Sequence, residues 1–535
     1  MKRQNRLLDL LRAMLLMFSL AAVSSPASAL NADDVHAMTI GDSDERIATI
    51  NKVAIGGDPG AQAFFEALLG NEVQVAGDEV FIVRDGKAVD AASGAPRTLP
   101  ADADDVINNN RLRGEIKAAL ASLKLLSADI VERQQAVKTL QEAPDEARLP
   151  LLDKALESET DARLKSQIGL LRAAIMVSSQ DRDKRLKAAV LLEQGSEPSI
   201  KALLLERLQP DVETDPEVRT QLKAALSSLE TKLAWGESLG IVFTGISLGS
   251  ILVLVALGLA ITYGLMGVIN MAHGELMMIG AYATYVVQNL FRTWLPDYFD
   301  AYVLVAIPVS FLAAAFVGAV LERGVIRWLY GRPLETLLAT WGISLVLMQA
   351  VRSIFGAQNV PVENPSWLSG GVEVLSNLTL PYNRIAIIVF AILVFGGLTY
   401  MVSRTRLGLF VRGVTQNRKM AACMGVNTAR VDTSAFALGS GIAGLAGCAL
   451  SQVGNVGPDL GQGYIVDSFM VVVLGGVGQL IGTVYAALGL GIINKLLEDW
   501  TGAVLAKIFV LVLIVIFIQK RPQGLFAMKG RSAEA

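Results

Sequence analysis

The sequence has few of the residues that enzymes and nucleic-acid-binding proteins use. Among its 535 residues are two cysteines and two histidines, His36 and His273. It contains no C-x-x-C, no H-E-x-x-H and no G-x-x-x-x-G-K-[ST] pattern, so a zinc or redox site, metal-centred or Ser/His hydrolysis, and ATP binding in a P-loop all lack their residues. The formal charge is −3, and no basic stripe with interleaved aromatic residues favours nucleic acid as a partner. We therefore expect no metal, no cofactor and no enzymatic activity.

Charged and apolar residues divide the chain into two unlike parts. Residues 30–235 are rich in charge and are typical of a soluble domain, whereas residues 239–526 are dominated by apolar runs. Both cysteines, Cys423 and Cys448, lie in or beside the apolar part, so disulfides cannot stabilise the soluble part. The predicted fold is an all-α polytopic membrane protein with about eight or nine transmembrane or re-entrant helices, preceded by a mostly α-helical soluble extracytoplasmic domain.

The first 29 residues have the order of a secretory signal peptide. Basic residues precede the short apolar core 13–23, and Ala27-Ser28-Ala29 supplies a small-x-small cleavage site. The alternative is an uncleaved signal anchor. Both interpretations place the residues that follow outside the cytoplasm.

Residues 30–235 carry mainly helical patterns. Residues 61–69 favour a helix, and residues 72–90 alternate and break at Asp85-Gly86, which is typical of a hairpin. From Asp104 onward the period is helical. Asp161, Asp183 and Asp215 are each followed by apolar residues at +3 and +7, which predicts an acid at a helix start and one buried face. We expect a small stack of helical repeats with a structural or docking role.

The apolar part contains about nine segments of membrane-compatible length. A helix of ~20 residues spans the ~30 Å hydrocarbon layer. The segments are 241–261, a second one running through Val287, 301–321, 334–355, 384–403, 434–453, 465–481, 483–497 and 503–519. Basic residues collect at 323–332, 404–430 and 520–531. By contrast, 356–383 contains two glutamates and no basic residue. Because cytoplasmic loops are rich in Lys and Arg, we expect these three regions and the C-terminus in the cytoplasm.

A polar, glycine-rich stretch separates the first two apolar segments. Asn270, His273 and Glu275 lie there with almost no soluble linker on either side. Such a break in lipid must be covered by protein or line a path, so we predict a broken helix beside a translocation path. Alternatively, Asn270 caps the second helix and Glu275 opposes its dipole.

A second glycine-interrupted stretch, 474–482, suggests that two related halves build a central path. Further candidates for the path are Thr340 and Trp341 in the fourth segment, and Asp467 and Gln479 near the ends of the seventh. Trp341 suits a lipid-facing position equally well.

The loop 404–434 differs from the other loops. It is strongly basic and contains a predicted short helix from about Thr415 to Met424 that ends at Gly425. A cytoplasmic helix bounded by glycine favours a docking element for another protein. The alternative, an ordinary basic cytoplasmic loop, explains the charge but not the helix.

Four motifs, in order along about 239–526, resemble the membrane permeases of branched-chain amino acid ABC importers. They are Tyr263–Glu275 (YGLMGVINMAHGE) with Met278–Tyr282 (MIGAY), the loop from Arg412 to Val431 with Ala421–Asn427 (AACMGVN), Leu474–Thr483 (LGGVGQLIGT), and Arg521–Phe526 (RPQGLF). The loop from Arg412 to Val431 is similar to the family's ATPase-coupling loop. The resemblance assigns to coupling Arg412, Asn417, Arg418, Ala421, Ala422, Gly425 and Asn427.

Within that family the long signal-bearing extension is similar to the urea permease B-type subunit of some bacteria. The resemblance implies a multi-pass subunit of the bacterial inner membrane that imports urea by alternating access. The implied partners are a second permease, cytoplasmic ATP-binding subunits and a periplasmic substrate-binding protein. Two alternatives stay open: import of branched-chain amino acids, and a passive urea or amide channel.

Overall fold

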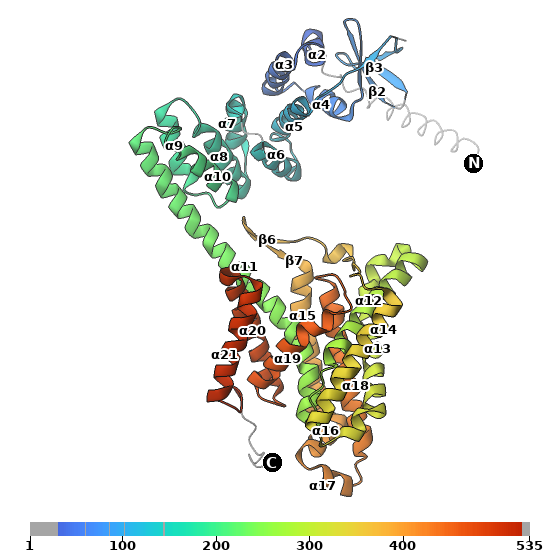
Figure 1. Cartoon of the computed structure of the whole chain (residues 1–535). Coiled ribbons are helices and arrows are strands. Elements are labelled where there is room, and N and C mark those ends of the chain that lie inside the picture. Colours follow the sequence, from blue (N-terminus) through green and yellow to red (C-terminus); the bar gives the residue numbers. More distant parts are fainter. Residues whose placement is uncertain (1–29, 59, 85, 101, 143–144, 527–535) are drawn as a thin grey trace, which may run out of the picture. The chain divides into compact units, whose positions relative to one another are not determined.

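The structure is a computed structural model, and it describes residues 30–58, 60–84, 86–100, 102–142 and 145–526 (Figure 1). The predicted signal peptide lies outside these residues and stays a prediction. The chain forms two compact units, one up to Leu233 and one from Ala234. Each unit is described by itself below.

The first unit begins with helices around a small antiparallel sheet. Helices α2 (Ala32–Thr39), α3 (Ser43–Gly56), α4 (Ala61–Gly70) and α5 (Asn110–Lys124) enclose an apolar core that includes Phe64, Phe65 and Ile116. The sheet has the order β4-β3-β2-β1-β5, and its strands are β1 (Val73–Ala76), β2 (Glu79–Arg84), β3 (Lys87–Asp90), β4 (Pro96–Arg97) and β5 (Asp104–Asp105).

The predicted hairpin is confirmed, because Arg84 pairs with Lys87 and Gly86 has φ +75°. The helical series starts later than expected. Asp104 and Asp105 form an edge strand that pairs with β1, so the first helix of the series begins at Asn110. The unit is therefore mainly helical but not wholly so.

Two equivalent groups of helices follow. The first comprises α6 (Ile130–Glu142), the 3₁₀ turn η1 (Glu146–Arg148), α7 (Leu149–Ser158) and α8 (Ala162–Met176). The second comprises α9 (Arg182–Leu192), α10 (Pro198–Arg207) and the start of α11 (Pro216–Met266). The motifs Ser-x-Asp-x-x-x-Arg and Glu-Thr-Asp occur once in each group, roughly 50 residues apart, which is the spacing of helical-repeat proteins.

The same ionic contact closes both repeats. Arg133 donates from Nε and Nη2 to the two oxygens of Glu159 (2.8 and 3.1 Å), and from Nη1 to two backbone carbonyls at the helix start. Arg185 makes the same set of bonds to Glu213 (2.7 and 3.3 Å) and to the carbonyls of Ser179 and Gln180. Both glutamates are buried. We call these two contacts the Arg–Glu clamps.

The clamps correct the predicted repeat. Asp161 caps its helix as expected, and Asp215 accepts from the N–H groups of Glu217 and Val218. Asp183, however, lies inside the first turn of α9, and the cap is Asp181. The buried face of α9 is shifted accordingly, because Val190 is exposed whereas Ala188, Ala189 and Leu192 are buried.

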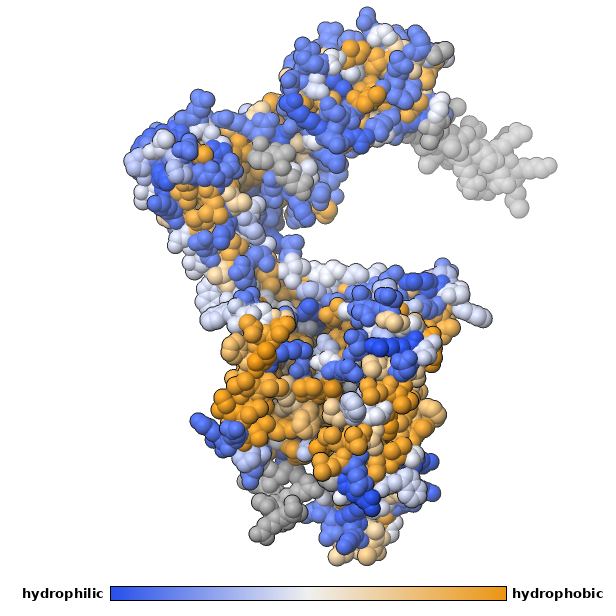
Figure 2. All heavy atoms as spheres, viewed as in Figure 1, coloured by the Kyte–Doolittle hydropathy of each residue, from blue (hydrophilic) through white to orange (hydrophobic). Residues whose placement is uncertain are grey.

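In the second unit, helices correspond to all nine predicted apolar segments. They are the part of α11 from Ala234, α12 (His273–Trp294), α13 (Tyr302–Gly324), α14 (Pro333–Phe355), α15 (Tyr382–Arg404), α18 (Thr428–Ser451), α19 (Leu460–Gly475), α20 (Leu480–Thr501) and α21 (Ala503–Lys520). Within the described residues, seven helices are long and apolar enough to cross a membrane: α11, α13, α14, α15, α18, α20 and α21. Figure 2 shows their hydrophobic side chains as a broad belt on this unit. The chain is a polytopic α-helical membrane protein.

The predicted segment 465–481 is shifted toward the N-terminus in the structure, since α19 ends at Gly475. Short elements connect the long helices. They are η2 (Pro296–Ala301), η3 (Ile326–Leu329), η4 (Ser366–Leu368), the hairpin β6 (Gly371–Leu375) and β7 (Leu378–Pro381), and helices α16 (Arg406–Gln416) and α17 (Arg418–Cys423).

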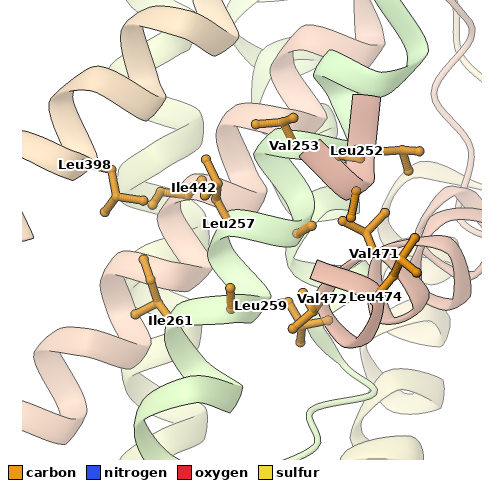
Figure 3. Packing of buried hydrophobic residues seen from close by; sticks show 14 of the residues in the cluster. Leu252, Val253, Leu257, Leu259, Ile261, Leu398, Ile442, Val471, Val472 and Leu474 are labelled. Carbon is orange, nitrogen blue, oxygen red and sulfur yellow. The ribbon is translucent and has the colours of Figure 1, made fainter. Parts of the chain in front are cut away.

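Helices α12, α13 and α18 lie side by side in this unit (Figure 1). Glycines bring their backbones into contact, because a Cβ at Gly280 would overlap Gly444, one at Gly444 would overlap Ser310, and one at Gly447 would overlap Met277. Small residues allow this approach in lipid, where hydrophobicity itself does not drive helices together. Beside this trio, the middle of α11 packs Leu252, Leu257 and Leu259 among side chains of α15, α18 and α19 (Figure 3).

Candidate translocation path and coupling site

The predicted break between α11 and α12 is present. Helix α11 ends at Met266, Gly267 has φ +66°, and α12 begins at His273. The left-handed backbone at Gly267 is one that a residue with a Cβ rarely adopts, so this glycine allows the helix to end there.

The three polar residues of the break are almost fully buried. Asn270, His273 and Glu275 expose 1%, 0% and 1% of their surface. Asn270 Oδ1 accepts from the N–H of Ala272 (3.1 Å), so it caps the turn before α12 rather than the helix itself, whose N-cap Ala272 has no side-chain bond. His273 Nε2 lies 3.1 Å from the carbonyl oxygen of Val255, which holds the imidazole against α11.

Each of these residues also carries a buried atom without a hydrogen-bond partner among the described residues: Asn270 Nδ2, His273 Nδ1 and Glu275 Oε2. The hydroxyl of Tyr282, two helical turns beyond Glu275, is also buried without a hydrogen-bond partner among the described residues. A buried polar group without a partner is costly, so such atoms indicate a site where a polar solute or water binds.

Two of three buried hydroxyl groups on α14 bond to the residues of the break. Thr336, Thr340 and Ser344 are buried on one face of an otherwise largely exposed helix. Thr340 Oγ1 accepts from the N–H of Met271 (3.2 Å), and Ser344 Oγ donates to Glu275 Oε1 (2.9 Å). Sequence reasoning identified Thr340 but missed Thr336 and Ser344, although their spacing of four residues on an apolar helix was a usable signal.

The second break joins α19 to α20. Gly476 and Gly478 have φ of +100° and +80°, and a Cβ on Gly264 would lie 2.7 Å from the Cα of Gly478. The two predicted breaks therefore meet at backbone distance. The C-terminal motif covers the second break, since the N–H of Leu525 donates to the carbonyl oxygen of Leu474 (2.8 Å).

The basic loop contains two helices instead of the single predicted one. Asn417 ends α16 and caps α17 by accepting from the N–H of Met420 (2.9 Å), so the expected helix 415–424 is interrupted at this residue. Gly425 has φ +84° and ends α17 as predicted, and Asn427 caps α18. Met420 and Met424 are exposed, so α17 presents apolar side chains on its surface.

The other coupling candidates serve this local geometry. Arg412 Nη1 donates to the carbonyl oxygen of Val402, which connects α16 to the end of α15. The carbonyl oxygens of Ala421 and Ala422 accept from the N–H groups of Val426 and Gly425 and close the turn after α17. Arg418 bonds to Asp432 of α18.

Comparison with known proteins identifies the class. The family described as branched-chain amino acid transport system / permease component matches residues 241–518. The chain belongs to this family.

Two permease relatives are matched over almost their whole length. The high-affinity branched-chain amino acid transport system permease protein BraD of Pseudomonas aeruginosa is 30% identical over 285 residues, which are 52% of this chain and 93% of that protein. The corresponding protein LivH of Escherichia coli is 29% identical over 300 residues, 53% of this chain and 93% of LivH. The ribose import permease protein RbsC of Escherichia coli is 31% identical over 110 residues, 19% of this chain and 34% of RbsC. No solved structure matches the chain.

The remaining path candidates of this permease, Trp341, Asp467 and Gln479, lie at different positions. Trp341 is about half exposed, so it lies on the exposed face of α14 and does not join the buried group at the break. Asp467 on α19 lies 3.7 Å from Lys507 of α21, with which it forms an ion pair. Gln479 is at the second break, where its backbone forms the N-cap of α20. The structure thus brings together Asn270, His273, Glu275 and Thr340, and leaves Trp341 and Asp467 outside the group.

Proposed function

We propose that the chain is the permease subunit of an ATP-driven importer and that its path passes the α11–α12 break. The observation that carries the proposal is the family match over 241–518 together with the unpartnered buried atoms of Asn270 and Glu275. Permeases of this family work with a second permease, ATP-binding subunits and a periplasmic binding protein. Helix α17, with its exposed methionines, would receive the ATP-binding subunit.

Branched-chain amino acids are the first candidate substrates, because BraD and LivH are named as permeases of branched-chain amino acid transport systems. The free oxygen of Glu275 suits the α-ammonium group of an amino acid, and the Nδ2 group of Asn270 suits its carboxylate. Urea is the second candidate. It rests on the resemblance of the long N-terminal extension to the urea permease subunit, a region that lies outside the family match over 241–518. Urea also offers N–H donors and a carbonyl acceptor to the same two atoms.

Uptake by cells carrying the whole transport system, measured with and without this chain, distinguishes between these candidate functions. ATP-dependent uptake of labelled leucine that needs this chain supports the amino acid importer. Uptake of labelled urea that ignores excess leucine supports the urea importer and contradicts the first candidate. Equilibration of either solute after ATP depletion contradicts an ATP-driven importer and indicates a channel.

The variant Glu275→Gln sharpens the choice, because it keeps the shape of the side chain and removes its charge. Import of an amino acid should fall about tenfold or more, since its ammonium group loses a charged partner. Import of neutral urea should change far less. If leucine is the substrate and the variant transports it normally, Glu275 does not contact the substrate.

We also propose that residues 30–233 lie outside the cytoplasm and contact the binding protein or the outer face of the second permease. The two native cysteines make the topology testable, because Cys423 is exposed on α17 and Cys448 is buried. A membrane-impermeant thiol reagent applied to spheroplasts should spare Cys423. In a Cys423→Ser background it should label Asp78→Cys, whose side chain is fully exposed. Normal uptake and assembly after deletion of 30–230 behind the intact signal peptide would contradict the docking role.

A further inference from the structure

The first residue of α17 is tied to the membrane helices. Arg418 donates from Nη2 to Asp432 Oδ2, and its Nη1 lies 3.4 Å from Oδ1, so the pair is bidentate. Asp432 is 3% exposed, whereas Arg418 reaches it from the exposed loop. The guanidinium also lies 5.0 Å from the ring centroid of Tyr330, which fits a cation–π contact.

A second acid extends this contact to α13. Glu322, which is 1% exposed, accepts from the hydroxyl of Tyr330 (3.0 Å) and from Thr433 Oγ1 (2.5 Å). Burial, and then the nearby charge of Glu322, raises the pKa of Tyr330 well above its ordinary value of 10.0, so the hydroxyl keeps the proton that it donates. Residues from α17, α18, α13 and the turn after η3 thus form one polar cluster.

This cluster leads to the candidate path through rigid contacts. Asp432 and Thr433 lie in the first turns of α18, and Glu322 lies near the end of α13. These two helices pack backbone to backbone with each other and with α12, through Gly444 and Gly447. Helix α12 carries Glu275. A close-packed trio of this kind transmits a displacement from one helix to the next, since packed interiors have low compressibility.

We propose that Arg418 and Asp432, with Tyr330 and Glu322, form a latch that transmits the position of α17 to the helices carrying the broken segment. This inference rests on the proposed function, since it assigns to the latch the transfer of ATP-driven movement. Separating Arg418 from Asp432 would leave a carboxylate buried without its partner, which is costly. Movement of α17 therefore carries the start of α18 with it. Arg418 and Asp432 are positioning residues and do not touch the solute.

The test uses the full chain assembled with its partner subunits. Arg418→Asp and Asp432→Arg, made singly, should each reduce the maximal uptake rate at least tenfold while the KM for the solute stays within twofold. They should also abolish the stimulation of ATP hydrolysis by the loaded binding protein and spare basal hydrolysis. The double exchange, Arg418→Asp with Asp432→Arg, should restore uptake to within about threefold of the original. Arg406→Asp, an exposed basic residue of the same loop, is the matched control and should transport normally.

Recovery of each variant in the membrane and its co-purification with the ATP-binding subunits keep the outcomes distinct. Single variants that transport normally overturn the latch. So do single variants that lose the ATP-binding subunits and are not rescued by the double exchange, because Arg418 then contacts the partner directly. If the unsubstituted protein shows no ATP-dependent uptake, the proposed function is overturned, and the latch with it. If the unsubstituted protein is active and the single variants transport as it does, only the latch is overturned.

Discussion

The two units of this chain hold their helices together in different ways. In the first unit, charged clamps join the helices of each repeat: Arg133 binds Glu159, and Arg185 binds Glu213. In the second unit, glycines at 280, 444 and 447 bring backbones into contact. The hydrophobic effect collapses helices in water, and polar contacts then select one register. In lipid, close approach and hydrogen bonds must themselves provide the attraction. The clamps of the first unit therefore use ionic residues, whereas the close backbone contacts of the membrane unit use small residues.

Filling a glycine contact in the membrane unit should have the largest effect. Gly447→Leu would place side-chain atoms against the backbone of Met277 and Ala281 on α12. We expect loss of uptake and of the monodisperse protein on size-exclusion chromatography. Gly396→Ala on α15 is the control, because nothing lies within 4 Å of a Cβ there. Normal transport by Gly447→Leu would mean that close backbone packing does not stabilise this unit.

Removing one hydroxyl from the break should have a smaller but clear effect. Thr340→Val keeps the shape of the side chain and removes the acceptor of the Met271 N–H. We expect uptake to fall by roughly tenfold, since a buried donor loses its partner. Trp341→Leu, one position along the same helix and exposed, should change uptake by less than about twofold. Equal effects at the two positions would contradict the assignment of α14's buried face to the break.

Breaking a clamp should destabilise the first unit moderately and spare the membrane unit. Glu159→Gln and Glu213→Gln should each lower the Tm of the first unit's transition by roughly 5 °C, and by similar amounts, since the two contacts are equivalent. The measurement is thermal unfolding followed by limited proteolysis of each unit. Glu230→Gln, which alters an exposed ion pair with Lys201, should have little effect. Unequal clamps would argue against two equivalent repeats.

Acid should weaken the Arg133–Glu159 clamp and lower the stability of the first unit by a smaller amount. The hydrogen bonds from Arg133 are the first cause that lowers the pKa of Glu159 below its ordinary value of 4.5. A carboxyl whose pKa is lower in the folded state contributes stability above its unfolded pKa and loses it as pH falls. The first unit should therefore unfold more easily as the pH decreases below about 4.5. In Glu159→Gln this part of the pH dependence should disappear. A variant with the unchanged pH profile would contradict the contribution of Glu159.

Much of the architecture could be predicted because its signals are local. Runs of apolar residues predicted the helices of the membrane unit, and the glycines at 267, 476 and 478 marked the two breaks where the backbone adopts positive φ. The failures were also local in origin. Asn417 and Asp181 are caps that interrupt or start helices, and each competed with a neighbouring signal of similar strength, so the coupling helix and one repeat were assigned incorrectly.

The sequence alone determined the class of the protein, its helices and the places where they break. These follow from run length, helical period and the conformational freedom of glycine, which act within a few residues. Only the tertiary structure decided which polar groups meet: Ser344 with Glu275, Arg418 with Asp432 and Tyr330, and each arginine with its clamp glutamate. A helical period predicts which face of a helix is buried but not which helix covers it. That pairing depends on the register between distant helices, and in the membrane unit glycine contacts set that register.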